Sequence, residues 1–225
     1  MTPWVLLDIA PVPGNGRELR LYRREDEFSI RIAGRGELMN SRVHGSEDAL
    51  AEQTCARLAG CSAPRLLIGG LGMGFTLAAA LRQVGEQARV VVAELVPAVV
   101  AWNRGPLGEH AGHPLQDPRV TVHEGDVAGL LRSARQAYDA ILLDVDNGPE
   151  GLTRKENDWL YGMAGLNAAY AALRPRGVLA VWSAGPDQAF SQRLQKVGFV
   201  VEEVRVRGHG STGARHIIWF ARRGA

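Results

Sequence analysis

The arrangement of apolar residues changes near Ser46 and divides the chain into two regions. In the first region, short apolar stretches are separated by turns rich in Gly, Pro and Asn, a pattern that predicts β-strands. The expected strands are WVLLDIA (4–10), ELRLYRR (18–24), EFSIRIAG (27–34) and GELMNSRV (36–43). We therefore expect a small N-terminal β-region over residues 1–45.

In the second region, expected strands and helices alternate. Residues 46–60 open with a Ser and an acidic turn and close on Gly60, which predicts a capped helix. Five apolar runs then read as buried strands, and each is followed by a segment expected to be helical, the fourth of which is stopped by Pro175. The strands are 65–70, 88–95, 118–126, 138–145 and 177–184, and the helices are 75–84, 97–104, 127–135, 157–175 and 187–198.

This alternation predicts a parallel sheet covered by helices on both faces. The last two apolar runs, FVVEEVRVR (199–207) and ARHIIWFARR (214–223), are joined by a Gly-rich turn and predict an antiparallel hairpin at the edge. The expected fold class is thus α/β, with a seven-stranded Rossmann-like domain over residues 46–225.

Composition narrows the class of protein. Hydrophobic residues make up 46% and charged residues 22%, as in a globular protein with a substantial core, and the net charge of +2 is too small and dispersed to indicate nucleic-acid binding. The N-terminus carries Asp8 within a very short apolar run, and no run approaches the roughly 20 residues of a membrane span. The spacing of Cys55 and Cys61 fits neither a metal site nor a disulfide framework, so we expect a cytoplasmic protein. From the charge and the short apolar runs we expect no nucleic-acid or membrane partner.

Candidate chemistry gathers where the expected parallel strands end, because ligands of such sheets bind at their carboxyl edge. Four glycines follow the first of these strands: Gly69, Gly70, Gly72 and Gly74. They allow close approach of a ligand to the backbone, or they form a tight packing turn. Glu94 ends the next strand, twenty residues past the last glycine, where a carboxylate can accept both hydroxyls of a ribose.

Acidic residues also end the next two strands. Asp126 opens a helix, and it is either an N-cap or a partner for the exocyclic amine of a base. Asp144 and Asp146 would point to one side of their strand, where a carboxylate pair can hold a cationic amine or accept a proton, although an Asp-Asn-Gly turn is the alternative. His110 and His113 lack a third partner of clear spacing, so we expect no metal.

Taken in order, these landmarks resemble class I S-adenosylmethionine-dependent enzymes, and most closely the spermidine synthase-like family. The segments that carry the resemblance lie between residues 46 and 200 and are LLIGGLGMGFTLAAAL, VVAELVPAVV, DPRVTVHEGD, YDAILLDVDNGP with NDWLYG, and AALRPRGVLAVWS. The resemblance implies a class I methyltransferase fold, with residues 1–43 as a shortened N-terminal β-domain. Relatives are commonly dimers, so a homodimer is an expectation by analogy.

The resemblance also implies roles for single residues. Gly70 and Gly72 would face the methionine-like part of the ligand, and Asp144 would be the acid nearest the acceptor. A loop over residues 146–159 would cover the acceptor. The ribose would be bound by Glu94, the base would lie beside Leu95 and meet Asp126, and the cofactor-binding set would be completed by Met73, Gly74 and Val127.

Three departures from the family pattern affect the expected reaction. Met73 stands where aminopropyltransferases carry an acid that binds the amine of decarboxylated S-adenosylmethionine. Asn147 replaces the second acid of the acceptor motif, and in the family's Tyr-His-Glu motif Leu50 and Ala51 replace the first two residues, so only Glu52 is retained. Two like charges about 4 Å apart cost roughly 4 kcal/mol at an effective dielectric of 20, enough to select the decarboxylated ligand, and Met73 cannot supply that selection.

We therefore expect methyl transfer from S-adenosylmethionine to a small, amine-bearing acceptor, with Asp144 as base or amine anchor and Asp146 beside it. Polyamine aminopropyl transfer from decarboxylated S-adenosylmethionine is the alternative. A nucleoside-binding protein without catalysis is a third.

Overall fold

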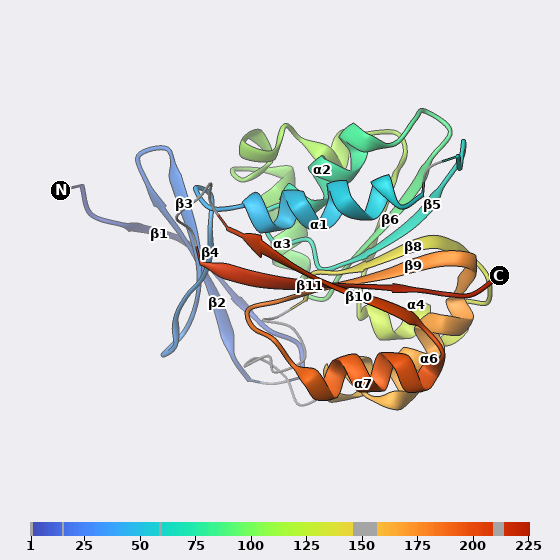
Figure 1. The fold of residues 1–225 in the computed structure, drawn as a ribbon. Coiled ribbons are helices and arrows are strands. Elements are labelled where there is room, and N and C mark those ends of the chain that lie inside the picture. The colour runs from blue at the N-terminus through green and yellow to red at the C-terminus, as the bar shows by residue number, and fades with distance from the viewer. Residues whose placement is uncertain (1, 15, 59, 146–156, 209–213) are drawn as a thin grey trace.

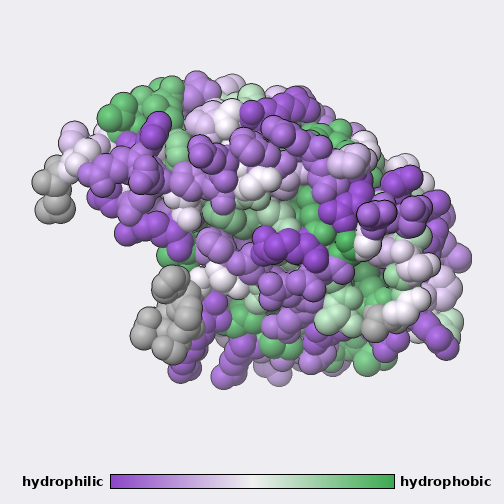
Figure 2. Space-filling view, turned by 90° about the horizontal axis from the view of Figure 1, so that it is seen from above, coloured by the Kyte–Doolittle hydropathy of each residue, from purple (hydrophilic) through white to green (hydrophobic). Residues whose placement is uncertain are grey.

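The computed structural model describes residues 2–225 apart from 15, 59, 146–156 and 209–213. Its strands form two sheets, a four-stranded one at the left of Figure 1 and a seven-stranded one to its right. The surface seen from above is mostly hydrophilic, with apolar residues in scattered groups (Figure 2). Asp146 and most of the expected acceptor loop lie outside the described residues.

The N-terminal sheet is an antiparallel meander of β1 (Val5–Pro11), β2 (Glu18–Arg24), β3 (Glu27–Ile32) and β4 (Gly36–Asn40). Alternate residues of β2 and β3 point inward, so Leu19, Leu21, Phe28 and Ile30 are buried. These side chains belong to a hydrophobic core that also includes residues of the larger sheet and its helices, such as Leu50. The N-terminal sheet is therefore held against the rest of the molecule by a shared core. The domain boundary at residue 45 stays a prediction.

The larger sheet contains β5 (Arg65–Gly69), β6 (Arg89–Glu94), β7 (Val120–Glu124), β8 (Tyr138–Leu143), β9 (Leu173–Ser183), β10 (Val200–Arg207) and β11 (Arg215–Arg222). Their order is β10-β11-β9-β8-β5-β6-β7. Neighbours among β7, β6, β5, β8 and β9 pair parallel, and β11 pairs antiparallel with both β9 and β10, so β11 alone of the seven runs in the opposite direction. The predicted seven-stranded Rossmann-like sheet with a C-terminal hairpin is confirmed, and the strand order reverses between β5 and β8, where such sheets bind ligands.

Helices cover both faces of this sheet (Figure 1). One face carries α1 (Gly45–Ala56), α2 (Phe75–Gln83) and α3 (Pro97–Arg104), and the other carries α4 (Val127–Ser133), α6 (Met163–Ala172) and α7 (Gln188–Val197), with the short α5 (Asn157–Tyr161) before α6. Two 3₁₀ turns follow α3, η1 (Gly108–Ala111) and η2 (Pro114–Gln116). No helix in the described ranges is long and apolar enough to cross a membrane.

Two predicted helices differ from the observed ones. The first begins at Gly45 and ends at Ala56, before Gly60, and the Ser46 hydroxyl bonds to the Glu47 carboxylate instead of capping the helix. The helix expected over 157–175 is divided at Gly162 into α5 and α6, and Pro175 lies inside β9. Gly165 is tightly packed just after this division, where a Cβ would lie 2.3 Å from the carbonyl oxygen of Trp159.

Candidate active site

The glycine turn after β5 is tight enough to require glycine. Gly70, Gly72 and Gly74 all have positive φ angles, which side chains rarely adopt. A Cβ on Gly70 would lie 2.2 Å from the backbone oxygen of Asp144, so only a bare Cα lets the end of β5 approach the end of β8. The turn therefore places the start of α2 and the residue that follows β8 side by side.

Glu94, at the end of β6, holds this turn in place. Its Oε2 accepts a hydrogen bond from the Leu71 amide and its Oε1 accepts one from the Val96 amide, both at 2.9 Å. Burial raises the pKa of Glu94, and the backbone amides oppose that shift by favouring the carboxylate. The amides of Gly72 and Leu95 also act on this carboxylate, and the predicted contact with ribose hydroxyls stays a prediction.

Asn103 is a second support of the turn, and the strand-end pattern of the sequence did not point to it. Its Nδ2 donates to the Gly72 carbonyl oxygen at 2.8 Å and to the Val99 carbonyl oxygen at 2.9 Å. The side chain is only 1% exposed. A buried Asn on α3 therefore fixes the orientation of the Gly72 peptide.

Asp126 is the N-cap of α4. Its Oδ1 accepts a hydrogen bond from the Ala128 amide at 2.9 Å, so the N-cap alternative of the sequence is confirmed. The side chain is exposed and borders a cavity, and the predicted contact with the amine of a base stays a prediction. Val127, the next residue, is buried beside it.

A cavity of about 930 Å³, counted out to its open mouth, lies between the two sheets. This nucleoside cavity, as we call it, has apolar N-terminal residues such as Leu19 and Ile30 on one side. Its other side contains seven of the predicted site residues: Gly70, Gly72, Glu94, Leu95, Asp126, Val127 and Asp144. Gly74 borders neither this cavity nor the next. The volume lies in the range of small-molecule sites.

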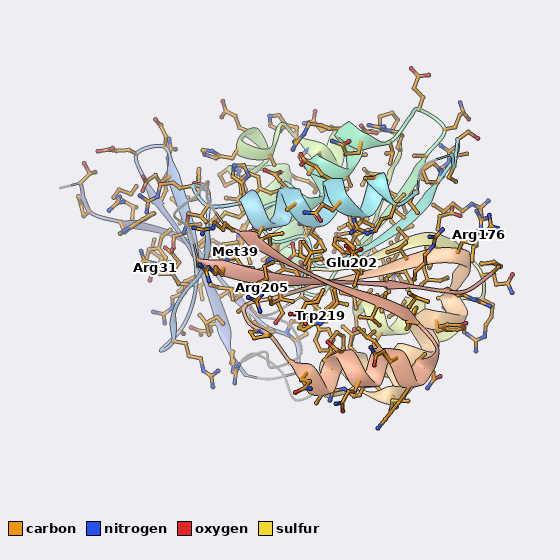
Figure 3. All side chains as sticks on the ribbon, in the orientation of Figure 1. Arg31, Met39, Arg176, Glu202, Arg205 and Trp219 are labelled. Atoms are coloured by element: carbon orange, nitrogen blue, oxygen red, sulfur yellow. The ribbon has the colours of Figure 1, made fainter. Side chains whose placement is uncertain are left out.

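A second cavity of about 600 Å³, also counted out to solvent, adjoins the first, and we call it the acidic cavity. The two share Leu38, Met39, Gly72 and Asp144 as lining residues, which places Asp144 where they meet. Met39 comes from β4, where the small sheet meets the large one (Figure 3). The predicted Met73 lines the acidic cavity and is 4% exposed.

Asp144 is equipped to exchange a proton near neutral pH. Burial, and next the nearby Glu47 carboxylate, raise the pKa of Asp144 to about 7, against the opposing effect of a hydrogen bond from Thr76. That bond runs from Thr76 Oγ1 to Asp144 Oδ2 at 2.6 Å. A carboxyl group with such a pKa, at the junction of two cavities, is a candidate general base.

Glu47 is a charged residue of the site that the sequence prediction missed, and Arg17, which lines the nucleoside cavity, is another. Glu47 lies in the first turn of α1, where an acid is expected simply for helix stability. Burial raises the pKa of Glu47, and its Oε2 accepts a hydrogen bond from the Ser46 hydroxyl at 2.6 Å. Together with Asp144 it lines the acidic cavity, and no Lys or Arg of the described chain does so.

The described residues include no group of three or more His, Cys, Asp or Glu side chains placed to hold a metal ion. Cys55 and Cys61 are both free thiols. The candidate site consists, then, of the nucleoside cavity, the acidic cavity and the carboxyl group between them.

Comparison with known proteins agrees with this arrangement. A family model described as the spermine/spermidine synthase domain matches residues 54–197. The chain belongs to the spermine/spermidine synthase family. The resemblance found in the sequence is thereby confirmed.

Among curated family relatives, polyamine aminopropyltransferase 1 of Streptomyces coelicolor is 30% identical over 149 residues, which cover 63% of this chain and 27% of that protein. The chain thus spans about a quarter of the length of this relative.

Solved structures of the family share the fold. A spermidine synthase in complex with the transition-state analogue AdoDATO has a TM-score of 0.77 at 18% identity, covering 97% of this chain and 72% of that one. The Thermotoga maritima spermidine synthase gives 0.77 at 17% identity with the same coverage. A probable spermidine synthase from Corynebacterium glutamicum gives 0.66 at 17% identity, covering 97% and 79%.

Proposed function

We propose that this chain transfers an aminopropyl group from decarboxylated S-adenosylmethionine to a small amine. The observation that carries the proposal is the position of Asp144, a carboxyl group with a pKa of about 7 between a nucleoside-sized cavity and a cavity that contains a second carboxylate. Family membership and the aminopropyltransferase relative support the same activity. Methyl transfer, which the sequence had put first, finds no support among the relatives named above.

The nucleoside cavity fits the adenosyl part of such a donor. Glu94 lines this cavity and is assigned to the ribose hydroxyls, and Leu95 and Val127 provide apolar contact for the base. Asp126, at the exposed end of α4, is placed to accept from an exocyclic amine. We assign the donor's sulfonium to the junction near Gly72 and Asp144, which both cavities share.

A bound sulfonium supplies an activated carbon: attack by an amine nitrogen forms a C–N bond, breaks the C–S bond and leaves the electron pair on sulfur. The chain's task is alignment and proton removal. An alkylamine with a pKa of about 10.4 is protonated at neutral pH and must lose a proton before it attacks. Ionised Asp144 accepts that proton, and the Thr76 hydroxyl keeps the accepting carboxylate oriented.

The charge of the acidic cavity favours binding of an amine. Two carboxylates, Glu47 and Asp144, border it, while its remaining described walls are neutral. Ammonium groups are attracted to such a cavity and carboxylates are repelled. The cavity therefore favours amine groups, both that of the donor's aminopropyl chain and that of a small amine acceptor approaching Asp144. A homodimer stays a prediction by analogy.

The test is a product analysis with the purified chain. We expect incubation with decarboxylated S-adenosylmethionine and the diamine putrescine to release methylthioadenosine and an aminopropylated amine. A parallel reaction with intact S-adenosylmethionine would yield S-adenosylhomocysteine if the chain transferred methyl groups. Formation of S-adenosylhomocysteine without methylthioadenosine would overturn the proposal. Binding of the donors without either product would favour a nucleoside-binding protein.

A further inference from the structure

The glycine turn brings no charge to the acidic cavity. Met73 is the turn's side chain there, and it is packed in the hydrophobic core with 4% of its surface exposed. Both donors carry an ammonium at that terminus and intact S-adenosylmethionine adds a carboxylate, so selection against the intact donor requires a negative charge near that terminus. The charge in this chain must therefore come from another element.

Helix α1 supplies such a charge. Glu47 lines the acidic cavity from the first turn of α1 and is near enough to Asp144 to raise its pKa. The Ser46 hydroxyl donates to Glu47 Oε2, which restrains the side chain in this position. Because Glu47 is partly buried, its charge acts more strongly than one on the open surface.

The walls beside Glu47 also suit an alkylammonium group. Phe75 and Trp182 both line the acidic cavity, and aromatic faces attract cations. Phe75 is fixed by stacking on His44, with ring centroids 4.2 Å apart. Trp182 is tilted against the ring of His216 at 4.8 Å. Carboxylate and aromatic groups thus surround one small volume.

We propose that Glu47 is the specificity-determining residue of this site and that its carboxylate binds the terminal ammonium of the aminopropyl donor. This inference rests on the proposed function. A donor seated in the nucleoside cavity reaches the acidic cavity past Gly72 and Asp144, the residues common to both. Its reacting carbon then lies near Asp144, and its chain end lies beyond it, on the Glu47 side. The carboxylate of intact S-adenosylmethionine would meet Glu47 as a like charge.

Calorimetry with the full chain tests this role. The ligands are decarboxylated S-adenosylmethionine, intact S-adenosylmethionine and methylthioadenosine, which lacks the amine. We expect Glu47→Gln to weaken binding of the decarboxylated donor by about tenfold to a hundredfold, as for loss of one charged hydrogen bond. The same variant should bind intact S-adenosylmethionine more tightly and methylthioadenosine unchanged.

The control is Glu203→Gln on β10, where the side chain is exposed and borders neither cavity, and it should leave all three affinities unchanged. Equal weakening of all three ligands in Glu47→Gln would show a merely structural role, and an unchanged preference for the decarboxylated donor would overturn the inference alone. A wild-type preference for intact S-adenosylmethionine would instead overturn the proposed function. The gain in affinity for the intact donor cannot arise from misfolding, so the test stands even if the variant is less stable.

Discussion

Replacing Asp144 by Asn is expected to make the protein more stable at neutral pH while removing its activity. Asn has nearly the same shape and can still accept the hydrogen bond that Thr76 Oγ1 donates to Asp144 Oδ2. It cannot carry charge or accept a proton. The substitution therefore isolates the cost of keeping an ionisable group between the two cavities.

The magnitude follows from the pKa of Asp144, which rises from an ordinary 3.8 to about 7 in the folded chain. Between these values the unfolded chain has released the proton while the folded chain keeps it, so wild-type stability falls as pH rises, by about 1.4 kcal/mol per pH unit. Over the whole interval the loss is at most about 4 kcal/mol. Below the lower value both proteins are neutral at this site, so the wild type and the variant should be about equally stable there.

The assay is denaturant unfolding of the wild type and Asp144→Asn across this pH interval, together with the rate of methylthioadenosine release. The free energy of unfolding of the variant should increasingly exceed that of the wild type as pH rises, and the difference should level off above about pH 7. The transfer rate of the variant should fall by about 10²–10⁴-fold, as for loss of a general base. Glu203→Gln, on the exposed side of β10, is the control, and its free energy of unfolding should vary with pH as in the wild type. Parallel stability curves for the wild type and Asp144→Asn would refute the raised pKa, and undiminished turnover would refute the role as base.

Two further predictions concern the surroundings of Asp144. Gly70→Ala should destabilise the protein by about 2–4 kcal/mol in denaturant unfolding, since φ is +90° and the added Cβ would lie 2.2 Å from the Asp144 backbone oxygen. Gly129→Ala in α4, where a Cβ meets nothing within 4 Å, should instead stabilise it by about 0.5–1 kcal/mol, and similar losses in both variants would contradict the tight turn. Thr76→Val removes the hydrogen bond that lowers the pKa of Asp144, so the rising limb of the pH–rate profile should move to higher pH, while Thr76→Ser keeps the wild-type limb. An unmoved limb in Thr76→Val would show that this bond does not tune Asp144.

Much of the fold was predictable because its strands are buried. Near-continuous apolar runs such as those of β5 and β8 have few other interpretations in an alternating chain, and α3 was predicted with its observed bounds. The helix over 157–175 was predicted as one element, whereas it is divided at Gly162, next to a close contact of Gly165 with the carbonyl oxygen of Trp159. That contact joins residues whose spacing alone is compatible with one continuous helix.

The sequence by itself determined the strand-end residues Gly70, Glu94 and Asp144, since parallel strands must bring their carboxyl ends to one edge. Only the tertiary structure decided what these residues meet. In the sequence Glu47 is an ordinary acid in the first turn of a helix. It becomes part of the site because α1 packs beside α2 and because the N-terminal sheet, which shares a hydrophobic core with the larger sheet, forms one wall of the cavity. Charge in a pocket depends on distances through space, which residue order along the chain does not specify.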